Sequence, residues 1–152
     1  MSTTRQRQFV NPADAWDSTQ FGFSQAVVAA PGDLIFVSGQ VDWDANRVIG
    51  HRDLASQTPG AFANLISVLE AAGASAADVT ALRIYIVADP MDDTSAVSEA
   101  LRTTFGPGPG PAATWIMVRG LADPDFLIEV EATAVRRGYG ASGRAPDAMA
   151  RL

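Results

Sequence analysis

A single carboxylate near the end of the chain stands where strand geometry could put it to chemical use. Glu129 lies in LIEVEATAV, residues 127–135, whose alternation places it on one face of a strand. If PAATWIMV, residues 111–118, pairs antiparallel with that strand, Trp115 lies opposite Glu129 and Ala113 opposite the next acid. A carboxyl group beside an aromatic wall loses solvation and is suited to moving a proton. Glu129 is thus a candidate general acid/base or water-orienting group; the alternative is a solvated strand carboxylate, paired with Arg83.

Other chemistry is limited by composition. The chain has no cysteine and a single histidine, His51, so neither a thiolate nucleophile nor a convergent metal site is expected. No cofactor is expected either. Ser38 and Gly39, in VSGQ, end a predicted strand and can offer backbone N–H groups to a ligand carbonyl or carboxylate. The alternative is a plain transition from strand to loop.

Length and charge exclude several classes of protein. A chain of 152 residues suits one domain. It has no lysine, and its net charge of -6 argues against a partner with a phosphate backbone, so no nucleic acid is expected. The sequence shows no apolar run of membrane-spanning length and no signal-peptide pattern, which predicts a cytoplasmic protein with no membrane partner.

The periodicity predicts the elements that must hold these residues. Residues 24–30 and 33–38 are strand-like and are expected to form an opening hairpin across PGD. Apolar residues at helical spacing follow Thr58 and end at Gly73, and a second helix runs from about 92–94 to Gly106. Strands are predicted at 79–89 and in the two final segments. The order indicates an α+β fold: one five- to six-stranded, mostly antiparallel sheet with both helices packed on one face.

The other sheet face is then left without a cover. It is predicted to present a mixed set of polar and large apolar groups, namely Arg83, Tyr85, Trp115, Met117, Glu129, Glu131 and Thr133. Such a surface usually meets a ligand or another subunit, and an oligomer is expected.

Taken together, FSQAVVAAPGDLIFVSGQVDWD, NLISVLEAAGASAADV, RIYIV and LIEVEATAVRR resemble, in that order, the YjgF-type reactive intermediate deaminase (Rid) family. The resemblance covers residues 21–137, leaving an N-terminal extension at 1–20 and a tail at 138–152 that is expected to be flexible. It implies a chorismate-mutase-like fold and a homotrimer whose subunits form small-molecule clefts between them.

The resemblance also implies an activity: hydrolysis of reactive enamines and imines to a carbonyl compound and ammonia. Gly39 and Glu129 match the family's glycine and glutamate. Phe23 stands in place of the usual tyrosine, and Ala113 in place of the arginine that holds the substrate carboxylate. With Trp115 nearby, this implies a deaminase of altered specificity for a larger or uncharged imine, enamine or carbonyl compound. The alternatives are a non-catalytic metabolite-binding or stress protein and, less favoured by the acidic charge, an endoribonuclease or translation inhibitor.

Overall fold

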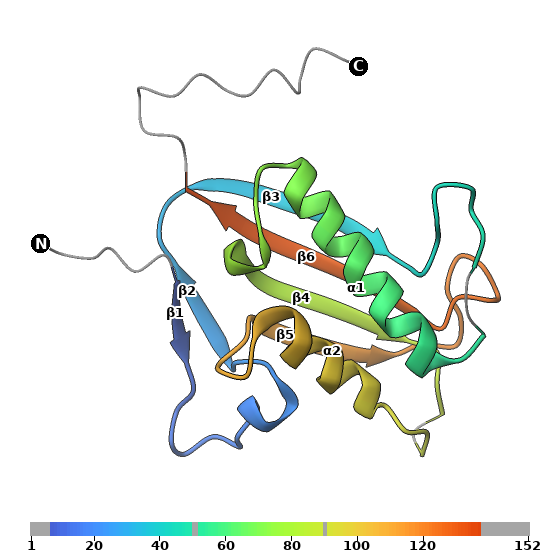
Figure 1. The fold of residues 1–152 in the computed structure, drawn as a ribbon. Helices are drawn as coiled ribbons and strands as arrows, with labels where there is room; N and C mark the ends of the chain where they lie inside the picture. Colours follow the sequence, from blue (N-terminus) through green and yellow to red (C-terminus); the bar gives the residue numbers. More distant parts are fainter. Residues whose placement is uncertain (1–6, 50–51, 90, 138–152) are drawn as a thin grey trace, which may run out of the picture.

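The computed structural model describes residues 7–49, 52–89 and 91–137, and shows a sheet with both α-helices on one side (Figure 1). His51 and the predicted tail at 138–152 lie outside these residues. The elements, in chain order, are β1 (Arg7–Val10), the 3-10 helix η1 (Thr19–Phe21), β2 (Ala26–Ala29), β3 (Asp33–Gln40), α1 (Leu54–Ala71), the 3-10 helix η2 (Ala76–Asp78), β4 (Val79–Ile86), α2 (Ser95–Phe105), β5 (Ala112–Met117) and β6 (Ile128–Arg136).

The strands form two sheets. A two-stranded antiparallel sheet joins β1 to β2, and a four-stranded sheet has the order β3-β6-β4-β5. Within the larger sheet, β6 runs antiparallel to both neighbours, whereas β4 and β5 are parallel. The predicted α+β class is confirmed, with two helices and a mostly antiparallel arrangement of six strands. The strands are divided between two sheets, however, and are not joined in one.

The predicted opening hairpin is wrong. β2 pairs with β1, a strand within the predicted N-terminal extension, while β3 pairs with β6 at the far end of the chain. An ion pair of 2.9 Å between Arg136 and Asp33 holds the end of β6 against the start of β3. The turn between the two predicted strands therefore redirects the chain from one sheet to the other.

The predicted pairing of the last two strands is also wrong, because β4 lies between them. A helix between two strands returns the chain to the end of the sheet at which the first strand began. Two strands joined through a helix therefore run parallel. α2 does this for β4 and β5, and α1 does it for β3 and β4, leaving a gap between β3 and β4 that β6 fills. The ten residues from 118 to 127 therefore cross over β4 instead of forming a tight hairpin.

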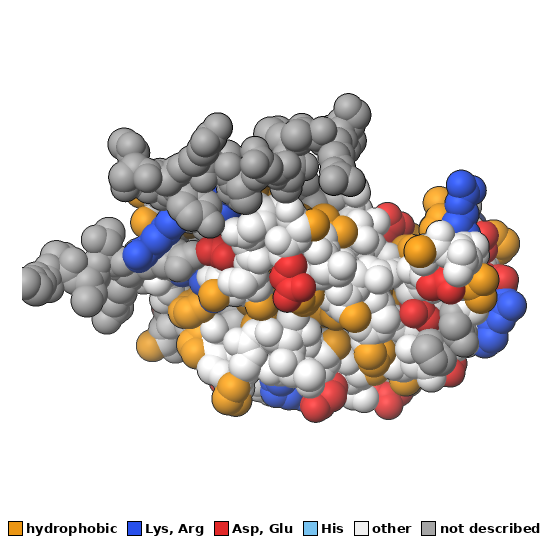
Figure 2. All heavy atoms as spheres, turned by 45° about the horizontal axis from the view of Figure 1, so that its top comes forward, with side chains coloured by type: hydrophobic (Ala, Val, Ile, Leu, Met, Phe, Trp, Pro, Cys, Tyr) orange, Lys and Arg blue, Asp and Glu red, His pale blue; other side chains and the backbone are white. Residues whose placement is uncertain are grey.

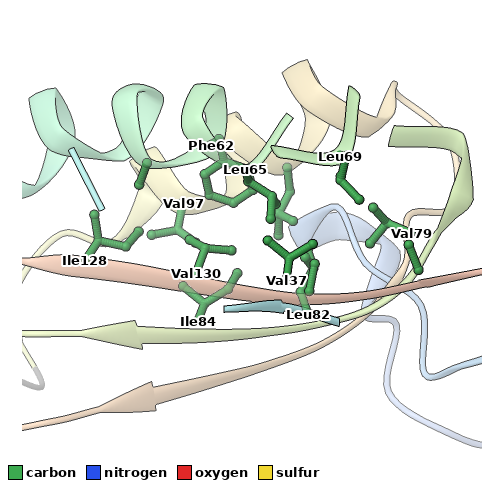
Figure 3. Close-up of a cluster of buried hydrophobic side chains, with 14 of the residues drawn as sticks. Val37, Phe62, Leu65, Leu69, Val79, Leu82, Ile84, Val97, Ile128 and Val130 are labelled. Atoms are coloured by element: carbon green, nitrogen blue, oxygen red, sulfur yellow. The ribbon is translucent and has the colours of Figure 1, made fainter. Parts of the chain in front are cut away.

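The core lies between the helices and alternate residues of the central strands (Figure 3). On β6 from Ile128 to Ala134, and on β4 from Leu82 to Ile86, every second side chain is buried, as strand geometry requires. Leu65 and Leu69 of α1 are fully buried against this surface. At roughly 1.5–3 kcal/mol for each large aliphatic side chain, this burial fixes which face of β6 points to the helices.

Helix α1 begins earlier than predicted. Its N-cap is Asp53, whose side chain accepts a hydrogen bond of 2.9 Å from the Ser56 backbone N–H, so Pro59 lies inside the helix. α2 ends at Gly106, as predicted. None of the helices in the described ranges is both long and apolar enough to cross a bilayer.

Candidate functional site

Glu129 lies on the face of β6 that the helices leave open. Its neighbours in sequence, Ile128 and Val130, are fully buried, while Glu129 is partly exposed. Its carboxylate lies over Gly39 of β3, and a Cβ atom at position 39 would collide with it. Among the described residues, this carboxylate makes no hydrogen bond or salt bridge. The structure therefore holds a carboxylate on an open face, against a residue whose lack of a side chain makes room for it.

Backbone irregularity marks the same place on β3. Val37 pairs with Ala132 and Gln40 with Val130, so the register shifts between these pairs and Ser38 and Gly39 fall in the irregularity. Such bulges re-aim side chains and interrupt the ladder, and they are common beside active sites. Ser38 is exposed on this edge. Ser38 and Gly39, both predicted to bind substrate, thus lie next to Glu129.

Strand β4 adds polar groups to this face. Tyr85 lies opposite Glu129, and Arg83 lies opposite Glu131. The Tyr85 hydroxyl donates a hydrogen bond to Glu131 Oε2, and this bond to an anion, with lesser contributions from desolvation and nearby acids, raises the pKa of Tyr85. We call Ser38, Gly39, Arg83, Tyr85, Glu129 and Glu131 the polar face; of these, Tyr85 had not been assigned a role in the sequence analysis.

A second group of predicted site residues lies elsewhere. Phe23, Ala113 and Trp115 line an open hollow of about 500 Å³ beside edge strand β5. The full lining is Trp16, Phe21, Phe23, Ser24, Gln25, Ala113, Thr114 and Trp115, which we call the aromatic hollow. The Trp115 indole N–H is buried and has no acceptor in the described part of the chain, so apolar packing alone holds this ring.

Local hydrogen bonds bring Phe23 to β5. Gly22 ends η1 with a φ of 90°, a conformation that favours glycine. The Ser18 hydroxyl then donates to the Phe23 carbonyl at 3.0 Å, and the Ser24 backbone N–H donates to the Pro111 carbonyl at 3.1 Å. These contacts place Phe23 beside the start of β5, where Ala113 lies.

The predicted proximity of Glu129 to Trp115 and Ala113 is wrong within one chain. Trp115 aligns with the buried Ile84 of β4 and Ala113 with the buried Leu82, so both point to the helix side of the sheet. The same holds for Met117, which aligns with Ile86 and had been predicted on the open face with Trp115. Thr114 and Ile116 take those places on the open face. The sequence predicted the alternation of side chains correctly within each strand. Because β4 lies between β5 and β6, however, the side chains of β5 that share a face with Glu129 are Thr114 and Ile116, and not Ala113, Trp115 and Met117.

Two walls of the hollow were not among the predicted site residues: from the sequence, Trp16 was weighed as a pocket wall but expected to be a packing residue, and Phe21 was given no role. Both lie in a segment without clear periodicity, and Trp16 is 59% exposed. Large aromatic residues exposed outside regular elements were the available signal. Among the described residues, no three His, Cys, Asp or Glu side chains group in a way that could hold a metal ion.

Comparisons with known proteins identify the family. The sequence profile of the Endoribonuclease L-PSP family, which includes the YjgF and Rid proteins, matches residues 17–136. The chain belongs to this family. A RutC family protein of Pyrococcus horikoshii is 34% identical over 115 residues, which are 75% of this chain and 86% of the relative.

Solved structures of the Rid family share the fold. YyfB of Yersinia pestis, described as a conserved Rid protein, is 38% identical with a TM-score of 0.82, over 87% of this chain and 100% of that one. TdcF of E. coli, solved with bound serine, is 25% identical with a TM-score of 0.61, over 75% of this chain and 87% of that one. The family match at residues 17–136 includes the polar face and the aromatic hollow apart from Trp16.

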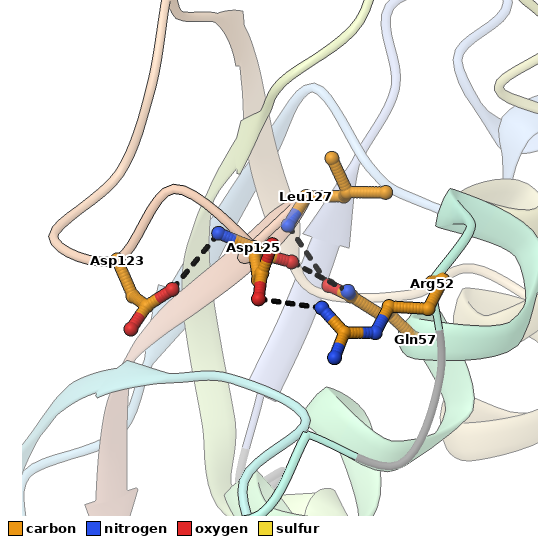
Figure 4. Close-up of polar contacts among 5 residues, drawn as sticks. All are labelled: Arg52, Gln57, Asp123, Asp125 and Leu127. Carbon is orange, nitrogen blue, oxygen red and sulfur yellow. Dashed lines mark hydrogen bonds and ion pairs between the residues drawn. The ribbon is translucent and has the colours of Figure 1, made fainter.

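A buried clamp from α1 holds the segment that leads into β6, just before Glu129 (Figure 4). The Gln57 side chain donates to the Asp125 carbonyl and accepts from the Leu127 backbone N–H, each at 2.8 Å. Arg52 adds an ion pair of 2.5 Å to the Asp125 carboxylate, but both side chains are half or more exposed. Gln57 is fully buried, so its two bonds fix the chain at Leu127, directly before β6 begins at Ile128 and two residues before Glu129.

Proposed function

We propose that this protein is a Rid-type hydrolase that acts on an imine or enamine lacking a carboxylate, in a cleft formed between subunits. The observation that carries the proposal is the Glu129 carboxylate, which lies over Gly39 without a hydrogen-bond partner of its own in the described chain. A carboxylate in this condition is available to orient a water molecule and to move its protons. The proposal needs no cofactor or metal and keeps the expected cytoplasmic location.

The chemistry is a hydrolysis in two stages. Water adds to the carbon of the C=N bond; its oxygen forms the new C–O bond, and Glu129 takes one water proton and passes it to the nitrogen, which gives a carbinolamine. Glu129 then takes the hydroxyl proton and passes it to the nitrogen; the C–N bond breaks, its electron pair leaves with ammonia or an amine, and the carbonyl forms. An enamine first gains a proton on carbon and gives up one from nitrogen, which converts it to the imine. The acid ends each cycle unchanged, so no other reactant is required.

The proposed cleft needs two chains. Ala113 and Trp115 of the hollow point to the opposite side of the sheet from the polar face. Thr114, the lining residue of β5 that shares the open face, is on the edge strand farthest from Ser38 and Gly39, so a single chain presents the two halves separately. The open face also carries large exposed apolar side chains: Leu34 is 61% exposed, Phe36 76% and Ile116 39%. Apolar groups on an open sheet face favour contact with another copy of the chain. In the proposed homotrimer, the polar face of one subunit meets the aromatic hollow of the next.

Substrate choice follows from position 113. The family's arginine would supply a bidentate, charge-assisted bond to a carboxylate, which a methyl group does not replace. TdcF, a relative, was solved with bound serine, which carries a carboxylate. Here Ala113 and its aromatic neighbours line the hollow, and no charged side chain is among the lining residues. A substrate whose recognition depends on apolar contact fits this lining better.

The test is hydrolysis of a panel of imines and enamines with and without a carboxylate, followed as release of ammonia, amine or carbonyl product. Turnover is expected for members without a carboxylate, and Glu129→Gln is expected to lower kcat by about 100-fold or more, a typical contribution of acid–base catalysis. Turnover that is unchanged in Glu129→Gln, or absent for the whole panel, would refute the proposal.

A non-catalytic binding protein is the second candidate, and the loss of the arginine at position 113 favours it. Saturable binding without product release would support this candidate. An endoribonuclease is disfavoured despite the family's name. Figure 2 shows basic side chains lying apart on the coloured surface, without a continuous patch that could follow a phosphate backbone.

A further inference from the structure

Four aromatic side chains of the hollow form a closed ring. Going round it, the ring centroids of Trp16 and Phe21 are 6.1 Å apart, Phe21 and Trp115 6.5 Å, Trp115 and Phe23 6.1 Å, and Phe23 and Trp16 5.8 Å. Three of the four interplanar angles are steep, at 65°, 78° and 73°, and the fourth, between Phe23 and Trp115, is 45°. A square of this size has its centre about 4 Å from each centroid, within the roughly 6 Å range of a cation–π contact.

Two of the four walls remain open to solvent. Trp16 is 59% exposed and Phe21 41% exposed, whereas Phe23 and Trp115 pack partly against the core. Exposed rings of this size cost free energy unless something covers them, and neither ring belongs to the apolar core. The arrangement gives two fixed inner walls and two accessible outer walls around an open volume of about 500 Å³.

The charges around the ring are mainly negative. The Asp17 carboxylate follows Trp16 directly, and the side chain and backbone of Thr19 donate to it, which lowers its pKa. Asp92 and Asp93 line an adjoining hollow that shares two of the four rings. Arg102 also lines it, but its guanidinium lies 3.5 Å from Glu99. The surroundings thus hold more acid than base, and the hollow itself contains no charged side chain.

We propose that the aromatic hollow binds an organic cation, an alkyl-substituted ammonium or iminium group, through the faces of its four rings. Aromatic rings attract such cations through the negative potential of their faces, and the acids nearby add a longer-range attraction. The proposal names the ligand class of the hollow, so it rests on the proposed function in assigning the hollow to the ligand. It also supplies what the methyl group of Ala113 cannot: recognition through the positive nitrogen instead of a carboxylate.

The experiment compares choline with 3,3-dimethylbutan-1-ol, a neutral molecule of the same shape, by calorimetric titration of the full-length protein. Choline is expected to bind at least fivefold more tightly than the neutral alcohol. Trp16→Leu keeps an apolar side chain but removes the ring, and should weaken choline binding at least fivefold while changing alcohol binding less than twofold. Phe21→Leu tests a second exposed wall, and thermal melting checks that both variants fold.

Trp43→Leu is the matched control. The ring centroids of Trp43 and Phe126 are 5.1 Å apart, and neither ring lines the hollow. The affinity for choline should therefore not change in Trp43→Leu. Equal affinity for choline and the alcohol would show a simple apolar pocket and overturn the proposal. If neither choline nor the alcohol binds, for example because a neighbouring subunit fills the space between the four rings, the proposal is overturned as well. Glu129→Gln separates the two proposals, because it should lose hydrolysis and still bind choline. A wild-type protein that hydrolyses members of the imine panel but does not bind choline would refute only this inference.

Discussion

At position 39 the lack of a side chain decides where the Glu129 carboxylate can lie. A Cβ atom there would meet the oxygen and outer carbons of a flexible side chain, so the chain can still fold if Glu129 moves aside. The glycine is therefore needed for the position of the Glu129 carboxylate more than for the conformation of the backbone at residue 39. Its φ is not in the left-handed region, so conformational strain is not the reason for a glycine at this position.

Gly39→Ala is accordingly expected to spare stability and to damage the site. Displacing a catalytic group by about 1 Å can cost up to about 100-fold in rate, so kcat should fall by about 10- to 100-fold with a small change in Tm. Gly120→Ala is the control, because a Cβ at position 120 meets nothing within 4 Å. Equal activity of the two variants, measured on a substrate of the wild-type protein, would contradict the account.

In the proposed function, position 113 sets the charge that the cleft accepts. In Ala113→Arg, a guanidinium in the hollow is expected to tighten binding of a small 2-keto acid by about 10- to 100-fold, the effect of hydrogen bonds to a charged group. Ala113→Gln adds similar length without charge and should give little gain. Titration of pyruvate checks this, and an equal response of both variants would show that charge at position 113 does not govern recognition.

At the scale of elements, the start of β6 depends on α1. Gln57→Leu leaves the Asp125 carbonyl and the Leu127 N–H without their buried partner, and two such groups should cost about 2–4 kcal/mol in the free energy of unfolding. Arg52→Ala breaks only an exposed ion pair to the same loop and should cost less than about 1 kcal/mol. Urea unfolding measures the free energy of unfolding of both variants. A similar loss of stability in Gln57→Leu and Arg52→Ala would argue against the clamp by Gln57.

The same elements show how far the sequence alone reaches. Alternation in LIEVEATAV correctly placed Glu129 on the open face, and VSGQ correctly placed Gly39 near the end of a strand, although the irregular register there was not predicted. The order of the strands could not be predicted from the sequence. β5 and β6 follow one another in the chain, which suggests a hairpin, but β6 instead fills the gap between β3 and β4 that the helix crossover leaves. Phe21 was given no role from the sequence, and Trp16 was expected only to pack, because their partners in the hollow come from β5, nearly a hundred residues away.

For the whole molecule, the central claim is that the polar face of one chain meets the aromatic hollow of another. Ser38 and Thr114 represent these halves on β3 and β5, the opposite edges of the four-stranded sheet. Three strand spacings put them about 14 Å apart in one chain. A disulfide needs Cα atoms within about 7 Å, so a bond between these positions must join two chains.

The most direct measurement uses the natural absence of cysteine. The double variant Ser38→Cys/Thr114→Cys is oxidised and run on a denaturing gel without reductant, beside each single variant. Covalent species up to a trimer are expected from the double variant, since a ring of three closes when each chain bonds the next. The single variants should give no trimer. A double variant that remains monomeric after oxidation would contradict the account of a cleft shared between chains.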